Sequence, residues 1–438
     1  MNKSLIICDR LIYGALLAMI FFLPYSFALI AVCQATMTIA WVSKRFLFGK
    51  EFSRQGCAQG FNFFSNSMGW ALMALGLLIV LTMPFSHDPA LTFKKLFTRY
   101  LQQIFLMYLV TETVHSRKRL YGVLAVLLLT FFLVTVDIMI QCMSGHSFVH
   151  HNPLTNGRVT GPMNEPNDLG TLLATVLPVV LASIIAFRKK KPLLVVISLL
   201  FLFLVVALGL TDSRGAWLAF AVSMMALSVC LKRLKITVLI VLMLGVLFWG
   251  YGMYCLDTRP DMSNAPTNHG LVLHPSLFNP LGLPASYNIS NLFFNTSNRE
   301  LYWDTAVNVI KHYPWFGCGY NAYVQTLRDL HVNHEEYPHN SLLHITAELG
   351  IVGLLLYLWL FVALCLQGWR VLRAVSCERE LYVLGCGASC GILAWMIHSL
   401  LDTPWSSLQL SLLLWLLIGI LMSLGFVLQN QKGDRPCQ

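Results

Sequence analysis

The feature that most constrains this chain is a series of uninterrupted apolar runs, each about 20 residues long. A helix of that length crosses a hydrocarbon layer of about 30 Å, and only a helix satisfies the backbone of a single segment there. The composition agrees, because 57% of the 438 residues are hydrophobic and only 11% are charged. The sequence therefore predicts an all-α fold, a polytopic bundle of transmembrane helices. Twelve runs are predicted, at 11–23, 25–43, 68–83, 96–114, 119–141, 166–187, 192–210, 213–231, 236–256, 341–368, 381–401 and 405–428.

The first two runs could instead form one long tilted helix bent at Pro24, since proline can kink a membrane helix without ending it. Charge placement favours two spans, because Lys and Arg in short loops mark the cytoplasmic side. With twelve spans and a cytoplasmic N-terminus, most of the 30 Lys and Arg residues fall on that side. Both termini are therefore predicted to be cytoplasmic. The net charge of +10 then reflects membrane orientation, and no nucleic-acid partner is expected.

Two connections on the opposite side are longer than the rest. Residues 1–256 are predicted to hold nine spans and a medium loop at 142–165, residues 257–340 a large loop, and residues 341–438 the last three spans. A connection as long as the large loop usually has a function. Within it, one short helix is predicted from Ser297 to the stop at Pro314, and a second from Asn321 to Leu330.

Three arginines on the side of these loops are candidates for binding an anion: Arg158 in the medium loop, Arg214 at the outer start of the eighth span, and Arg299 in the first loop helix. A guanidinium binds phosphate oxygens in a planar, two-pronged way, so three converging arginines would suit a diphosphate. The alternative for each arginine is that it extends to lipid headgroups. The sequence leaves both interpretations open.

His339 lies at the boundary between the large loop and the tenth span. A histidine exchanges a proton near neutral pH more readily than any other side chain, although a lone histidine there could also be an interfacial hydrogen-bonding residue. Four nearby residues could hold a divalent ion, but they lack the ligand spacing of a known zinc site: His331, His334, Glu335 and Glu336. We therefore expect neither a metal nor another cofactor.

Four acidic residues and two cysteines are not expected to take part in the chemistry of the site. Four acidic residues are expected to be helix caps and arginine partners, because nothing fixes their separation as in a glycosidase: Glu165, Asp168, Asp304 and Glu348. Cys255 and Cys318 are both predicted outside the cytoplasm, and whether they form a disulfide stays open.

An ordered set of motifs resembles the O-antigen ligase and polymerase superfamily. It consists of Arg299-x-x-x-Trp303, then Pro314 followed by Gly317-x-Gly319, then His339-Asn340, and then Glu348-x-Gly350-x-x-Gly353. Residues 157–167 and Ser213-Arg214-Gly215 also look like family positions. The resemblance covers about residues 155–360.

The resemblance implies a multi-pass enzyme of the bacterial inner membrane, with its active site at the periplasmic face. Such an enzyme takes a glycan from undecaprenyl diphosphate and, in the ligases, transfers it to the lipid A–core of lipopolysaccharide without a metal. By the family's motifs, Arg214 and Arg299 are assigned to the diphosphate, Arg158 to a helping role, and His339 to the acceptor hydroxyl. These assignments make His339, Arg214 and Arg299 the expected catalytic residues.

A ligase is the first expectation, and an O-antigen polymerase using the same donor is the second, because the two share these motifs and differ in acceptor. A transporter of the lipid-linked glycan is an alternative of a different class. Against it, the predicted spans contain almost no central charged residue apart from Asp137, and no internal repeat is evident.

Overall fold

The computed structural model describes residues 3–54, 63–233, 297–332 and 335–433. These residues form helices and contain no β-strand. The α-helices are α1 (Lys3–Phe22), α2 (Phe27–Arg54), α3 (Ser67–Thr82), α4 (Pro89–Lys95), α5 (Gln102–Thr113), α6 (Arg117–Ser144), α7 (Pro166–Ala186), α8 (Lys191–Leu210), α9 (Arg214–Cys230), α12 (Ser297–His312), α13 (Tyr323–Asp329), α14 (Ser341–Ala374), α15 (Arg379–Ser399) and α16 (Leu408–Gly433). Three short helices join them: η1 (Phe63–Ser65), η2 (Met83–Phe85) and the π-helical η3 (Leu96–Leu101).

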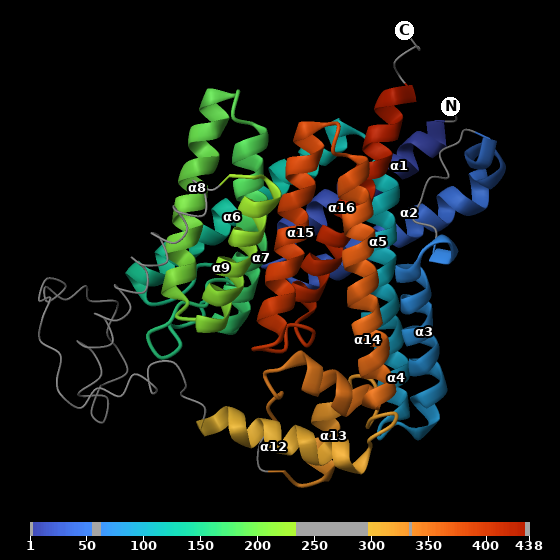
Figure 1. The fold of residues 1–438 in the computed structure, drawn as a ribbon, viewed down its shortest axis with the longest axis vertical. Helices are drawn as coiled ribbons and strands as arrows, with labels where there is room; N and C mark the ends of the chain where they lie inside the picture. Colours follow the sequence, from blue (N-terminus) through green and yellow to red (C-terminus); the bar gives the residue numbers. More distant parts are fainter. Residues whose placement is uncertain (1–2, 55–62, 234–296, 333–334, 434–438) are drawn as a thin grey trace, which may run out of the picture.

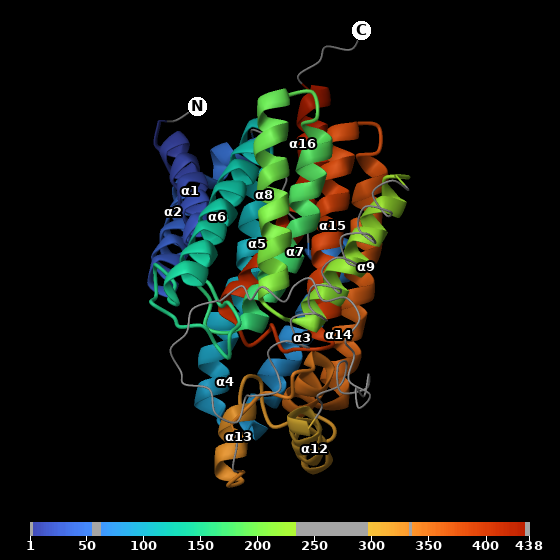
Figure 2. The same cartoon turned by 90° about the vertical axis from the view of Figure 1, so that its left-hand side faces the viewer.

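Most of the long helices run side by side as a bundle, with α12 and α13 grouped at one end (Figures 1 and 2). Nine helices of the described residues are long and apolar enough to cross a membrane: α1, α2, α3, α6, α7, α8, α14, α15 and α16. The predicted all-helical, multi-pass architecture is therefore confirmed, but the count of twelve spans is not. The predicted run 96–114 coincides with η3 and the 12-residue α5, and 213–231 with the 17-residue α9. The third remaining run, 236–256, lies outside the described residues.

The first two predicted spans are separate helices. A turn at residues 23–25 ends α1, and α2 then packs back against it. Pro24 lies in this turn, so proline ends the helix here rather than bending it. The alternative of one long kinked span does not describe this chain.

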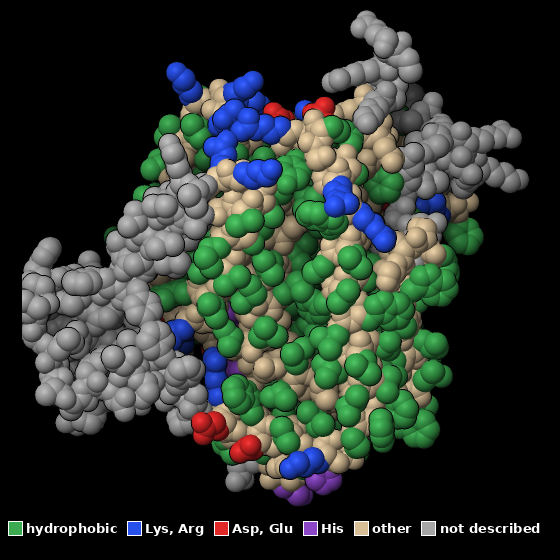
Figure 3. Space-filling model, viewed as in Figure 1, with side chains coloured by type: hydrophobic (Ala, Val, Ile, Leu, Met, Phe, Trp, Pro, Cys, Tyr) green, Lys and Arg blue, Asp and Glu red, His purple; other side chains and the backbone are tan. Residues whose placement is uncertain are grey.

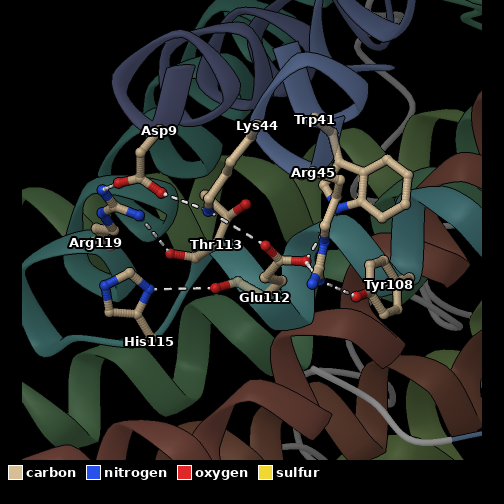
Figure 4. A network of polar contacts seen from close by, with 9 residues as sticks. All are labelled: Asp9, Trp41, Lys44, Arg45, Tyr108, Glu112, Thr113, His115 and Arg119. Carbon is tan, nitrogen blue, oxygen red and sulfur yellow. Dashed lines mark hydrogen bonds and ion pairs between the residues drawn. The ribbon is translucent and has the colours of Figure 1, made fainter. Parts of the chain in front are cut away.

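Helix α1 begins and α16 finishes at the same end of the bundle, which we call the termini end (Figure 1). An ion-pair network joins four helices there (Figure 4). Lys44 of α2 lies 3.3 Å from both Asp9 of α1 and Glu112 of α5, and Arg119 of α6 pairs with Asp9. Arg45 binds the other Glu112 oxygen at 3.0 Å. Buried charges are stable only when they are paired in this way, so the network fixes α1 and α2 to the rest of the bundle.

Lys and Arg side chains gather toward the termini end, and hydrophobic side chains cover most of the bundle below them (Figure 3). The basic connection 188–190 between α7 and α8 is part of this end. Its sequence pattern is that of a cytoplasmic surface. That both termini are cytoplasmic stays a prediction.

The centre of the bundle is formed by α7, α15 and α16, the spans with the largest buried shares. Helices α7 and α15 approach closely because glycines face the contact. A Cβ on Gly387 would lie 2.4 Å from the Cβ of Ala182, and one on Gly391 would lie 2.5 Å from the Thr175 carbonyl oxygen. Small residues allow membrane helices to pack backbone against backbone. This contact brings the N-terminal end of α7 beside the C-terminal end of α15, where the candidate site lies.

Candidate functional site

Two glycine motifs of the sequence meet where α14 is interrupted. Gly350 has φ of 67° and ψ of −171°, so the helical hydrogen bonding of α14 breaks there. The Cys318 and Gly319 amides donate to the carbonyls of Ala347 and Glu348 at 2.9 and 3.0 Å. On the other side of the break, the amide of Ile351 donates to the carbonyl of residue 314 at 2.9 Å. The loop after α12 is thus inserted into α14 by main-chain hydrogen bonds, and the groups freed by the break are satisfied.

The two backbones approach so closely that neither motif tolerates a side chain. A Cβ on Gly317 would lie 2.1 Å from the carbonyl carbon of Glu348, and one on Gly350 would lie 2.2 Å from that of Trp315. Gly317 also has a positive φ of 72°, which favours glycine. The motif glycines are therefore explained by docking of the loop, which holds α12 over the start of α14.

Docking of α12 brings Arg299 and Tyr302 to His339. The ring centroids of Tyr302 and His339 are 5.7 Å apart. The guanidinium of Arg299 is close enough to interact electrostatically with His339 and with His398 at the end of α15. The structure therefore gathers Arg299 and His339, which lie 40 positions apart in the printed sequence, at one place.

His339 is held by a carboxylate. Its Nδ1 lies 2.8 Å from Oδ1 of Asp402, in the connection between α15 and α16. The next residue, Asn340, caps α14 by accepting the amides of Leu342 and Leu343 at 2.9 and 3.0 Å. Its side-chain amide also donates to the Leu400 carbonyl at 3.1 Å. The His-Asn motif thus places the imidazole on Asp402 while the asparagine starts the helix.

The pair perturbs both groups. The hydrogen bond that His339 donates to Asp402 raises the pKa of His339 above its ordinary value, although burial and the charge of Arg299 act in the opposite direction. Burial by itself would raise the pKa of Asp402, but the hydrogen bond from His339 and the Thr403 amide hold it below its ordinary value. An ionised carboxylate only accepts, so Nδ1 of His339 is the donor, and in the neutral imidazole Nε2 carries the lone pair.

Arg158 binds two neighbouring segments of the same end. Its Nε donates to the carbonyl of Thr211, just before α9, at 2.8 Å, and an Nη donates to Oδ1 of Asn167 in the first turn of α7, also at 2.8 Å. Charge-assisted bonds of this kind are stronger than neutral ones. Arg158 therefore joins the medium loop to the starts of α7 and α9.

Arg214 is the first residue of α9, and it follows Ser213, whose Oγ lies 3.4 Å from Nε2 of His398. The other ring nitrogen of His398, Nδ1, lies 2.7 Å from Oγ1 of Thr171 on α7. Gly215 lets the imidazole approach, because a Cβ there would lie 3.1 Å from its Nε2. The arginines of the medium loop, of α9 and of α12 thus lie at the same end of the bundle as His339.

Two residues of this site were missed by the sequence analysis. His398 lies near the end of the predicted run 381–401 and was counted as part of an apolar span. Asp402 lies just beyond that run. The signal that could have found them is a histidine and an aspartate four positions apart at a helix end, since buried polar residues there need partners.

Of the four acidic residues predicted to be helix caps or arginine partners, Glu165 lies at an N-cap position and Glu348 pairs with a histidine. Oε1 of Glu348 lies 3.1 Å from Nε2 of His344, one turn earlier on α14, so its partner is a histidine rather than an arginine. Glu165 occupies the N-cap position of α7, but its side chain makes no capping hydrogen bond. Asp168 lies in the first turn of α7, and Asp304 is exposed on α12.

The alternative metal site at residues 331–336 and the possible Cys255–Cys318 disulfide each include a residue that the structure does not describe. His334 and Cys255 are not among the described residues, so the disulfide question stays open. Within the described ranges, no group of three or more His, Cys, Asp or Glu side chains could hold a metal ion. Glu335 instead pairs with Arg328 at 2.5 Å, and Cys318 is fully buried.

Comparison with known families identifies the segment that carries most of this geometry. Residues 197–358 match the family described as O-antigen ligase. This segment is similar to that family. The match includes Arg214, Arg299 and His339, whereas the partners of His339 and Ser213 at Asp402 and His398 lie beyond it. No curated protein matches the chain. The match thus covers the start of α9, the loop helices and the first part of α14.

Proposed function

We propose that the chain belongs to the O-antigen ligase family, which residues 197–358 match, and that it is a metal-independent glycosyltransferase. The donor would be O-antigen polysaccharide on undecaprenyl diphosphate, and the acceptor a sugar hydroxyl of the lipid A–core. We propose that the chain lies in the bacterial inner membrane, with both termini in the cytoplasm. The opposite end of the bundle, which carries the candidate site, would then face the periplasm. The observation that carries the proposal is the His339–Asp402 pair, at 2.8 Å, within electrostatic range of Arg299.

The pair suits activation of the acceptor. Asp402 holds Nδ1 of His339, so the neutral imidazole presents Nε2 as a base. In the proposed reaction, the acceptor hydroxyl gives its proton to Nε2 while its oxygen attacks the anomeric carbon of the donor. The bond from that carbon to the phosphate oxygen breaks, and undecaprenyl diphosphate leaves. The carboxylate of Asp402 stabilises the imidazolium that forms.

The arginines suit the leaving group. Negative charge grows on the bridging oxygen as the bond breaks, and fixed cations lower the barrier most where that charge develops. Arg299 and Arg214 are assigned to this role, with Arg158 holding the segments from which Arg214 starts. The start of α9 adds the positive end of a helix dipole beside Arg214.

Radiolabelled lipid-linked glycan, added to purified protein with and without lipid A–core, tests the proposal. Label that moves to lipid A–core supports the ligase. Longer glycan on undecaprenyl diphosphate, formed without the acceptor, would show a polymerase instead. Glycan that crosses a vesicle membrane without any transfer would show a transporter.

Two substitutions test the arginines. Arg214→Ala and Arg299→Ala should each reduce transfer about 100-fold or more while leaving membrane insertion intact, because each removes a cation from the leaving group. Arg328→Ala is the matched control, since Arg328 is an exposed arginine of α13 paired with Glu335. Wild-type turnover by either site variant would remove that arginine from the mechanism.

A further inference from the structure

A closed ring of hydrogen bonds surrounds the start of α9, and His398 completes it. Arg158 bridges the Thr211 carbonyl and the Asn167 side chain, both at 2.8 Å. The Thr171 hydroxyl donates to the Asn167 carbonyl at 2.9 Å. His398 then links Thr171 to Ser213, which is followed directly by Arg214. The bonds of this ring connect the medium loop, α7 and α15 with Thr211 and Ser213, which lie just before Arg214.

The ring determines how His398 is protonated. Thr171 has one hydroxyl proton, and that proton is used on the Asn167 carbonyl. Oγ1 of Thr171 can therefore only accept from His398, so Nδ1 carries the hydrogen of the 2.7 Å bond. In the neutral imidazole Nε2 is then an acceptor, and the Ser213 hydroxyl donates to it.

The imidazole of His398 is tightly enclosed by neighbouring residues. His398 is 1% exposed, and Thr171 and Ser213 are 1% and 3% exposed. A Cβ on Gly170 would lie 3.0 Å from the Cβ of Ser213, so α7 and the start of α9 are in direct contact. A buried ring held from two sides by hydroxyls fixes those hydroxyls in turn.

We propose that His398 is a positioning residue for donor binding. Through its bonds to Thr171 and Ser213, it sets the direction in which Arg214 leaves the start of α9 toward the diphosphate. It does not touch the reacting atoms. The same imidazole lies four residues before Asp402, so the end of α15 and the connection that follows it carry the group that directs an arginine and the group that orients the base. This inference rests on the proposed function and adds a specific residue to donor recognition.

Thr171→Val and Thr175→Val make a matched pair of tests. Both threonines are buried on α7 one turn apart, but the Thr175 hydroxyl has no hydrogen-bond partner among the residues that the structure describes. Thr171→Val should weaken binding of undecaprenyl diphosphate and raise the KM for the donor about tenfold, which is the value of roughly one hydrogen bond, with the KM for the acceptor unchanged. Thr175→Val should change neither constant.

Variants of His398 separate positioning from packing. His398→Asn retains an N–H near the Nδ1 position and should keep donor affinity closer to wild type than His398→Phe, which fills the space without hydrogen bonds. Equal donor affinity in the Thr171→Val and Thr175→Val proteins, or in the Asn and Phe variants, would overturn the inference. Wild-type protein that binds undecaprenyl diphosphate but transfers no glycan would instead overturn the proposed function, since binding is measured without any acceptor.

Discussion

Nδ1 of His339 and Oδ1 of Asp402 lie 2.8 Å apart although 63 residues separate them in the chain. One stands at the entrance to α14, and the other lies in the connection between α15 and α16. The Asp402 oxygen also accepts the amide of Thr403 at 2.8 Å, which fixes the carboxylate. A histidine that is oriented in this way can act as a base with one defined nitrogen.

Replacing Asp402 with Asn should change both the rate and its pH dependence. The hydrogen bond that His339 donates to Asp402 raises the pKa of His339. Because the imidazole acts as a base only when it is neutral, the rate of wild-type transfer should rise with pH through a midpoint above 6.5. Asp402→Asn removes the charge, so the midpoint should move to lower pH and the plateau rate should fall about 100-fold. Rates of glycan transfer across the pH range measure both effects. An unchanged midpoint would exclude His339 as the titrating base.

The same pair should make stability depend on pH in a defined direction. The raised pKa of His339 gives a stabilisation that is complete below 6.5 and is lost as the pH rises through the folded value. The lowered pKa of Asp402 gives one that is complete above 3.8 and is lost as the pH falls through its folded value. The pair should therefore stabilise most between these values. The difference in melting temperature between wild type and Asp402→Asn should be largest near about pH 5 and smaller at about pH 9. A constant difference would contradict the linkage.

Gly350→Ala should disrupt docking of the loop on α14. The added Cβ would lie 2.2 Å from the Trp315 carbonyl carbon, and the positive φ of 67° disfavours any side chain. We expect a loss of thermal stability and at least a tenfold loss of transfer, because α12 carries Arg299. Gly425→Ala on α16 is the control, since nothing lies within 4 Å of its Cβ position. Similar melting and transfer for the two variants would show that the close approach is not required.

Glu112→Gln should destabilise the protein without changing its chemistry. Glu112 is 8% exposed and binds both Lys44, at 3.3 Å, and Arg45, at 3.0 Å (Figure 4). Neutralising it removes the carboxylate charge shared by the buried Lys44 and by Arg45, although Lys44 keeps Asp9, at a cost of about 3 kcal/mol. Glu378→Gln, which removes the partially exposed partner of Arg117, should cost less than about 1 kcal/mol. Unfolding in detergent measures the stability, and transfer per folded molecule should stay at the wild-type value.

Much of the fold could be predicted because membrane spans are local in sequence. The turn at Pro24, the helices α12 and α13 within the large loop, and the grouping of Lys and Arg at the termini end all follow from short stretches of residues. The count of spans could not be confirmed in the same way. Around η3 the helix is π-helical, which hydropathy does not reveal, because a π-turn changes the hydrogen bonding and not the composition.

The residues of the candidate site likewise divide into those that the sequence predicts and those that only the structure reveals. Arg158, Arg214, Arg299 and His339 could be selected from residue type and motif alone, since a guanidinium suits a diphosphate and an imidazole suits proton transfer. Their partners could not. The bonds of His398 to Ser213 and Thr171 span 185 and 227 residues, and nothing local to any of the three residues records them.

By itself, the sequence determined that this chain is a helical protein with several apolar spans and a segment similar to the O-antigen ligase family, because apolar length, charge and motif spacing are properties of contiguous residues. Only the tertiary structure decided which carboxylate holds His339 and which imidazole directs the start of α9. Those pairings depend on how closely α7, α9 and α15 approach, and that distance is set by glycines and small side chains meeting across helices.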